Sequence, residues 1–172
     1  MSNEENIKKL NESSYQKAIK KLSGAKDENS RFCILGSLAI ACLNVGKIED
    51  AKKYADELNE SMSNHQNSWN YGNAVQDINV VLGRIAIIND QIEDAKKHLI
   101  EAGKSKGSPQ MLSFGPNMSL AKELLEKGEQ DVVLEYFELC RKFWENDRGN
   151  LDKWSQEVKD NIIPDFGGNL YY

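Results

Sequence analysis

Hydrophobic residues recur along this chain at intervals of three and four, and no stretch alternates apolar and polar positions as a strand would. This spacing predicts helices over residues 4–23, 29–45, 48–63, 68–89, 92–106, 117–127, 130–145 and 148–161. Residues 1–108 contain no proline, which also favours long helices. The last predicted helix carries Leu151, Trp154 and Val158 on one stripe, so we expect it to cover one end of a helical stack.

Two segments depart from this helical pattern. Residues 103–117 contain three glycines and two prolines, which predict a loop that Met111, Leu112 and Phe114 pin to the surface. Residues 62–74 form an insertion that contains Trp69 and Tyr71. We expect these two aromatic residues to pack beneath the neighbouring helix. The alternative is that they anchor a partner, because aromatic residues dominate interface hot spots.

The sequence also repeats itself. The segment Ile48–Lys53 recurs unchanged as Ile92–Lys97, 44 positions later. A third copy surrounds the pair Leu120-Ala121, and a fainter half-copy lies upstream at residues 4–25. The copies share small residues where helices must approach closely and larger apolar residues between them. The turn of each copy carries a residue that tolerates left-handed backbone, namely Gly46, Asp90 and Gly128.

These residues resemble the tetratricopeptide repeat, a helix–turn–helix unit of 34 residues. The best copy contains the pair Leu82-Gly83 followed by Ala95, Leu99 and Ala102. The copies lack the family's large aromatic residues and are spaced more widely, so they are divergent. The resemblance implies a single all-α domain over residues 1–172, an array of antiparallel helix hairpins with a right-handed superhelical twist. Its parts would be a half-repeat at 4–25, repeats at about 29–63, 68–106 and 117–145, and a C-terminal capping helix at 148–161.

The resemblance further implies a non-catalytic scaffold or adaptor whose concave face binds a protein or peptide. Carried over to this chain, that face comprises Ile40, Leu43, Asn44, Asp77, Arg84, Ile88, Met118, Lys122 and Leu125. We expect its apolar members to bury partner side chains and Asn44, Arg84 and Lys122 to orient the partner through hydrogen bonds. Arg84 lies among apolar residues and needs an acceptor, which is either a partner or a local acid such as Asp77.

The reactive residue types form no recognisable constellation. Cys33, Cys42 and Cys140 are widely spaced in apolar helical positions, which predicts small buried side chains rather than a nucleophile or a zinc site. His65 and His98 have no evident partner, and we expect both at the surface. The sequence therefore predicts no catalytic residue, no metal ligand and no cofactor.

The formal net charge is −5, which argues against a nucleic-acid partner because phosphates require a basic face. The chain has no long apolar run and begins with polar residues, so we expect no membrane partner and a cytoplasmic location. The excess of lysine over arginine is typical of bacteria with AT-rich genomes.

Two alternative functions stay open at this stage, as does the placement of the C-terminal segment. The chain could be a self-associating module, such as a homodimer formed around Trp69. It could also be a small enzyme on a helical scaffold. The C-terminal segment Phe166–Tyr172 is either a frayed tail or a segment that docks into a groove, its own or a neighbour's.

Overall fold

The computed structural model describes residues 3–171, and in this range the chain forms α-helices and short 3-10 turns without any strand. The all-α prediction is therefore confirmed. The α-helices are α1 (Asn3–Ser23), α2 (Glu28–Asn44), α3 (Ile48–Ser61), α4 (Tyr71–Ile88), α5 (Ile92–Gly103), α6 (Pro109–Phe114), α7 (Ser119–Glu126), α8 (Gln130–Cys140) and α9 (Asn150–Lys159). The 3-10 turns are η1 (Met62–His65) and η2 (Gly167–Leu170).

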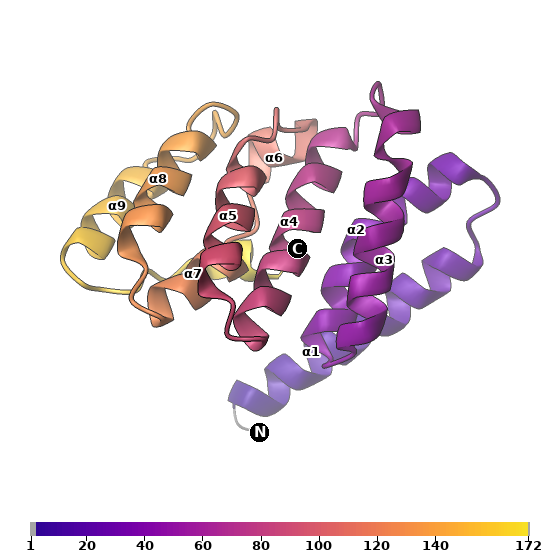
Figure 1. Cartoon of the computed structure of the whole chain (residues 1–172), viewed down its shortest axis with the longest axis horizontal. Helices are drawn as coiled ribbons and strands as arrows, with labels where there is room; N and C mark the ends of the chain where they lie inside the picture. The colour runs from indigo at the N-terminus through magenta and orange to yellow at the C-terminus, as the bar shows by residue number, and fades with distance from the viewer. Residues whose placement is uncertain (1–2, 172) are drawn as a thin grey trace.

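The helices lie side by side in a row, with α1 to α3 at one end and α8 and α9 at the other (Figure 1). Short turns join α2 to α3, α4 to α5 and α7 to α8, and the two helices of each pair pack against each other. The first helices of these pairs also contact along the row, because α4 packs on both α2 and α7. At the two ends α1 covers α2 and α9 packs on α8.

The three hairpin turns share one geometry. Gly46, Asp90 and Gly128 all have positive φ, at 79°, 59° and 84°, which confirms the prediction of left-handed turn residues. In each turn the next residue donates its backbone N–H to a carbonyl five positions earlier. These bonds, at 2.9, 2.8 and 3.0 Å, join Lys47 to Cys42, Gln91 to Ala86 and Glu129 to Leu124.

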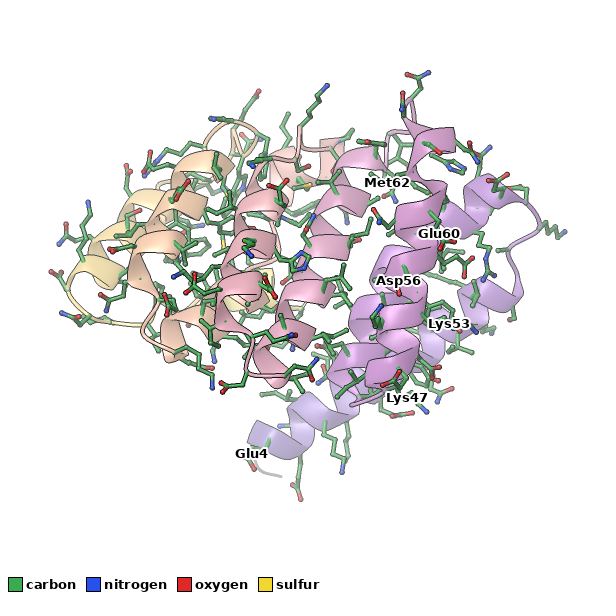
Figure 2. All side chains as sticks on the ribbon, viewed as in Figure 1. Glu4, Lys47, Lys53, Asp56, Glu60 and Met62 are labelled. Atoms are coloured by element: carbon green, nitrogen blue, oxygen red, sulfur yellow. The ribbon has the colours of Figure 1, made fainter. Side chains whose placement is uncertain are left out.

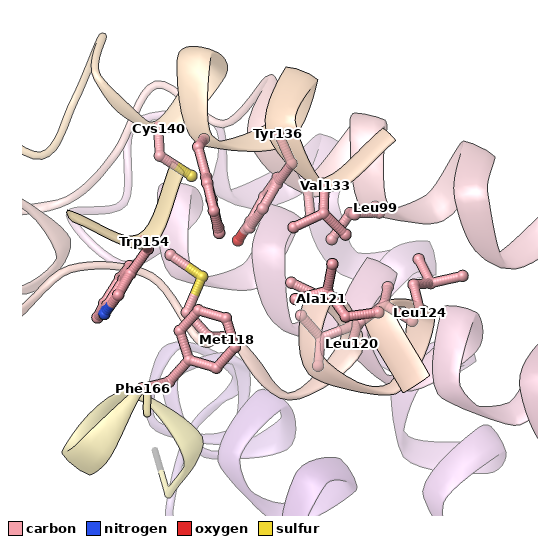
Figure 3. Packing of buried hydrophobic residues seen from close by; sticks show 14 of the residues in the cluster. Leu99, Met118, Leu120, Ala121, Leu124, Val133, Tyr136, Cys140, Trp154 and Phe166 are labelled. Atoms are coloured by element: carbon pink, nitrogen blue, oxygen red, sulfur yellow. The ribbon is translucent and has the colours of Figure 1, made fainter. Parts of the chain in front are cut away.

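The residues that recur in the sequence fill the core. Ala51, Ala95 and Val133 are fully buried, as are Ala55, Leu99 and Phe137. Figure 3 shows the larger part of this core, where Leu99, Val133 and Tyr136 pack over Leu120, Ala121 and Leu124. Gly83 lets α4 approach α7 closely, since a Cβ there would lie 2.4 Å from a methyl group of Leu120.

The segment predicted as a loop contains the additional helix α6. Ser108 caps this helix by accepting the backbone N–H of Met111 at 3.0 Å, and Pro109 occupies its first turn. Met111 is buried, as expected of a residue that pins the segment. The expectation is wrong for Phe114, whose side chain is 65% exposed.

Charged side chains cover the outward faces of the helices. Figure 2 shows Lys53, Asp56 and Glu60 along α3, whose opposite face carries the buried Ala51, Ala55 and Leu58. In the described part of the chain no helix is long and apolar enough to cross a bilayer.

Candidate functional site

A cavity of about 290 Å³ opens between α1 and α2, and we call it the α1–α2 groove. Its floor is apolar, because Ala18, Ile40 and Ala41 are buried there. Two large apolar side chains flank the opening and are about half exposed, Leu10 at 49% and Tyr171 at 48%. The remaining lining residues are Asn11, Ser14, Lys17, Lys21, Ser37 and Asn44.

The groove exists because α1 offers α2 small and polar side chains on one of its stripes. The apolar stripe of α1, formed by Tyr15, Ile19 and Leu22, packs on the core and holds the helix in place. A second stripe at helical spacing consists of Asn11, Ser14, Ala18 and Lys21. These side chains leave the space beside α2 unfilled, where larger apolar residues would have closed it.

The groove is locally cationic although the chain as a whole is acidic. Lys17 and Lys21 line it one helical turn apart, and both are exposed. Neither lysine has an ion-pair partner among residues 3–171, and no aspartate or glutamate lines the groove. The groove therefore presents positive charge to any ligand that enters it.

Arg84 connects the groove to the middle of the row. Its Nε donates to Oε1 of Glu123 on α7 at 2.7 Å, and its Nη1 donates to Oδ1 of Asn44 on α2 at 2.9 Å. Arg84 thus pairs with an acid of its own chain, as one of the two alternatives expected. This acid is Glu123, whereas the sequence had suggested Asp77. Because Asn44 lines the groove, Arg84 acts on the site by fixing the orientation of that amide.

Asp77 lies outside the groove, where α4 meets α2. Its carboxylate packs against Gly36, so closely that a Cβ on Gly36 would lie 2.1 Å from Oδ2. Asp77 forms no hydrogen bond or ion pair with the part of the chain that the structure describes. Burial raises the pKa of Asp77 to about 7, because the charged form loses water without gaining a partner.

Four other residues of the predicted concave face are buried within the chain, namely Ile40, Leu43, Met118 and Leu125. The physical reason is coverage: α2 is enclosed by α1, α3 and α4, and α7 by α4, α5 and α8. In this conformation Leu43, Met118 and Leu125 are buried in the protein's own core, whereas we expected them to line an open face. Only Ile40 reaches the floor of the groove.

The last two residues of that predicted face lie at the surface. Ile88, at the end of α4, is exposed. Lys122 forms an ion pair with Glu126 on its own helix. Neither lines the α1–α2 groove, so of the nine predicted residues only Ile40 and Asn44 line it, with Arg84 behind them.

Trp69 and Tyr71 occupy a separate region at the start of α4. The indole of Trp69 is 61% exposed, so the expectation that it packs beneath the helix is wrong, whereas Tyr71 is half-buried. Trp69 borders an open hollow whose other lining side chains are amides, hydroxyls, a thiol and an imidazole. These belong to Asn29, Cys33, Ser63, Asn64, His65, Gln66, Asn67 and Ser68.

Among the cysteines and histidines of the described structure, Cys33 and His98 are partly exposed and the other three are buried. Cys42 and Cys140 are buried, as predicted, and burial raises the pKa of both thiols, that of Cys42 to about 11. His65 is also buried and stacks on Phe32 with ring centroids 4.2 Å apart, so the expectation of a surface position is wrong. Within residues 3–171 no three histidine, cysteine or acidic side chains gather as metal ligands would.

The C-terminal segment docks on its own chain. Phe166 is buried against Trp154, with ring centroids 4.9 Å apart. The carbonyl of Asn169 accepts the backbone N–H of Met118 at 2.8 Å, and its side-chain amide donates to the carbonyls of Phe114 and Pro116 at 3.0 and 2.9 Å. The segment then reaches the α1–α2 groove through Tyr171, whereas Tyr172 lies outside the described residues.

Sequence reasoning missed most of the groove. It did not select Leu10, Ser14, Lys17 or Lys21, all of which line the groove. It raised the docking of Tyr171 into a groove of its own chain, but not which groove. The available signal was the stripe of small and polar residues on the first helix, beside its apolar stripe. This stripe predicts a groove only when the helix that packs opposite it is known.

A scan against protein-family models and searches among curated proteins and solved structures found no match to this chain. Its function is therefore inferred from the residues of the molecule itself.

Proposed function

We propose that this chain is a non-catalytic adaptor that binds a peptide segment of another protein in the α1–α2 groove. The observation that carries the proposal is an open groove with a buried apolar floor and a polar rim. Ligand sites combine these two features, because apolar contacts supply affinity and a few polar groups supply orientation. The half-exposed Leu10 at the opening adds apolar surface that a ligand would bury.

The scaffold of the proposal is a divergent tetratricopeptide-like array with a right-handed superhelical twist. The similar geometry of the turns at Gly46, Asp90 and Gly128 supports it, as does the burial of equivalent residues in each hairpin. In this scheme α1 is a half-repeat, the three hairpins are the repeats, and α9 is the cap. A terminal half-repeat leaves one face of its neighbour incompletely covered, which is where the groove lies.

The proposed mechanism is burial of one large apolar side chain of the peptide against Ile40 and Ala41. Burying such a side chain contributes about 1.5–3 kcal/mol. The Asn44 amide, held by Arg84, supplies a polar contact of defined direction. Of the apolar residues that we expected on a concave face, Ile40 is the only one to which this mechanism gives a contact with the peptide.

A displayed library of random peptides, selected for binding to the chain, tests this proposal. Ser14→Trp places a bulky side chain in the groove, and we expect it to weaken the selected peptides by about tenfold or more. Ser13→Trp is the matched control, because Ser13 is also exposed on α1 but does not line the groove. A library that yields no binder, or binders that tolerate Ser14→Trp, would contradict the proposal.

Self-association through Trp69 is a second candidate function. The observation that favours it is the large exposed fraction of the indole, which is unusual for a side chain of this size. Sedimentation velocity over a range of concentrations would reveal a dimer, and Trp69→Ser would shift it to monomer. A monomer at every concentration would eliminate this candidate.

A further inference from the structure

We infer that the α1–α2 groove takes an acidic peptide segment with one large apolar side chain, and that this side chain displaces Tyr171 of the chain's own tail. The inference rests on the proposed function and adds the chemical class of the partner. It also adds a built-in competitor for the same site.

The charge of the groove selects the class of peptide. Lys17 and Lys21 stand on neighbouring turns of α1, exposed and without an ion-pair partner in residues 3–171. A basic segment would meet two ammonium groups with no carboxylate to offset them, because none of the lining residues is acidic. An acidic segment would find both lysines available. Because the chain as a whole carries a net charge of −5, an acidic peptide would be attracted to this groove and repelled by the acidic parts of the surface.

The hydrogen-bonding groups of the groove point to the same class. The Oδ1 atom of Asn44 already accepts from Arg84, and Nδ2 forms no hydrogen bond within the described part of the chain. The hydroxyl of Ser37 donates to the carbonyl of Ile34 at 3.0 Å. Oδ1 of Asn11 and the hydroxyls of Ser14 and Ser37 are neutral groups that can also accept a hydrogen bond. The only charged groups that line the groove are the two ammonium donors, and carboxylates are the acceptors that match them.

The tail places Tyr171 at the groove in a way that allows exchange. Phe166 and Asn169 hold the segment firmly, through a buried ring and three hydrogen bonds. Tyr171, beyond these anchors, is only about half covered. Its tether gives it a high effective concentration at the groove, while its shallow contact makes it a weak occupant. A peptide side chain can take its place without releasing the anchored part of the tail.

Fluorescence anisotropy with three labelled peptides of equal length tests the inference. One contains glutamates around a phenylalanine, the second glutamates around a serine, and the third lysines around a phenylalanine. We expect only the first to bind well, with an affinity that falls as salt is added. We expect Lys17→Glu with Lys21→Glu to weaken this binding about tenfold or more.

Two further variants complete the experiment. Lys142→Glu with Lys159→Glu is the matched control, since these exposed lysines near the other end of the row make the same change in net charge. It should leave the affinity unchanged. Tyr171→Ser should raise the affinity a few-fold, because it removes the competitor but keeps the anchors at Phe166 and Asn169. Unfolding midpoints equal to that of the parent protein establish that each variant is folded.

The outcomes separate this inference from the proposed function. If lysine-containing and glutamate-containing peptides bind equally in the groove, the inference is overturned but peptide binding stands. If no peptide binds, including those from the random library, both fail. If Tyr171→Ser weakens binding, the tyrosine is part of the binding surface and its role as a competitor is overturned.

Discussion

The two terminal helices of the row, α1 and α9, close their ends in opposite ways. In α9 the residues Leu151, Trp154 and Val158 are all buried, and the helix seals the larger part of the core. In α1, which is twice as long, Ala18 is the one buried residue among the described side chains. Length therefore does not decide how well a terminal helix covers its neighbour.

The difference lies in the volume of the side chains on the facing stripe. Trp154 packs against the rings of Phe137, Trp144 and Phe166, which together fill the end of the stack (Figure 3 shows Trp154 and Phe166). Beside its apolar stripe, α1 presents a second stripe of serine, alanine, asparagine and lysine to α2. One end is consequently sealed, and the other retains an open groove.

The largest predicted effect separates the two ends directly. Trp154→Ala should lower the free energy of unfolding by about 3–5 kcal/mol, because it leaves a cavity among three aromatic rings. Leu10→Ala on α1 should change it by no more than about 0.5 kcal/mol, since that side chain is half exposed. Urea unfolding measures both values, and similar losses at the two ends would contradict the comparison.

The next effect concerns the junction of α2 and α4, which links the groove to the rest of the row. The pKa of Asp77 is about 7 in the folded chain against an ordinary value of 3.8. Between these values the folded chain holds a proton that the unfolded chain has lost, so stability falls as pH rises from about 4 to 7. The destabilisation is complete above about pH 7.

Asp77→Asn removes this ionisation. The free energy of unfolding of this variant, relative to that of the parent protein, should increase by about 2–4 kcal/mol as the pH rises from 4 to 8. Unfolding by urea at pH 4, 6 and 8 provides the measurement. Parallel pH profiles for the two proteins would show that Asp77 ionises freely.

A smaller effect distinguishes two arginine pairs. Arg84 is 16% exposed and joins three helices, whereas Arg31, which binds Glu57 between α2 and α3, is 42% exposed. Arg84→Met should cost about 1–2 kcal/mol, because Glu123 and Asn44 lose a partly buried donor. Arg31→Met should cost less than about 1 kcal/mol. If Arg31→Met lowered the free energy of unfolding more than Arg84→Met did, the structural role assigned to Arg84 would be contradicted.

Sequence reasoning succeeded where structure is local. Apolar spacing located the long helices, and the residues Gly46, Asp90 and Gly128 identified their turns, because both signals lie within a few residues of the feature they specify. Helix α6 was missed because six residues carry no periodicity, although Ser108-Pro109 was a usable start signal.

The candidate site could not be located in the same way. An apolar residue on a helix predicts burial but not the identity of what covers it, so Leu43 and Leu125 looked as suitable for a partner as for the core. Met118 is covered partly by a tail that follows it by about fifty residues. Similarly, Arg84 showed its need for an acceptor, but Glu123 lies on a helix whose position only the fold determines.

Hydrogen–deuterium exchange with and without the glutamate–phenylalanine peptide tests the central claim, that the α1 end binds a partner while the α9 end is closed. Slower exchange is predicted for the amides of residues 10–21 on α1 and 37–44 on α2, with no change in α9. Protection confined to α8 and α9, or to the region around Trp69, would contradict the account.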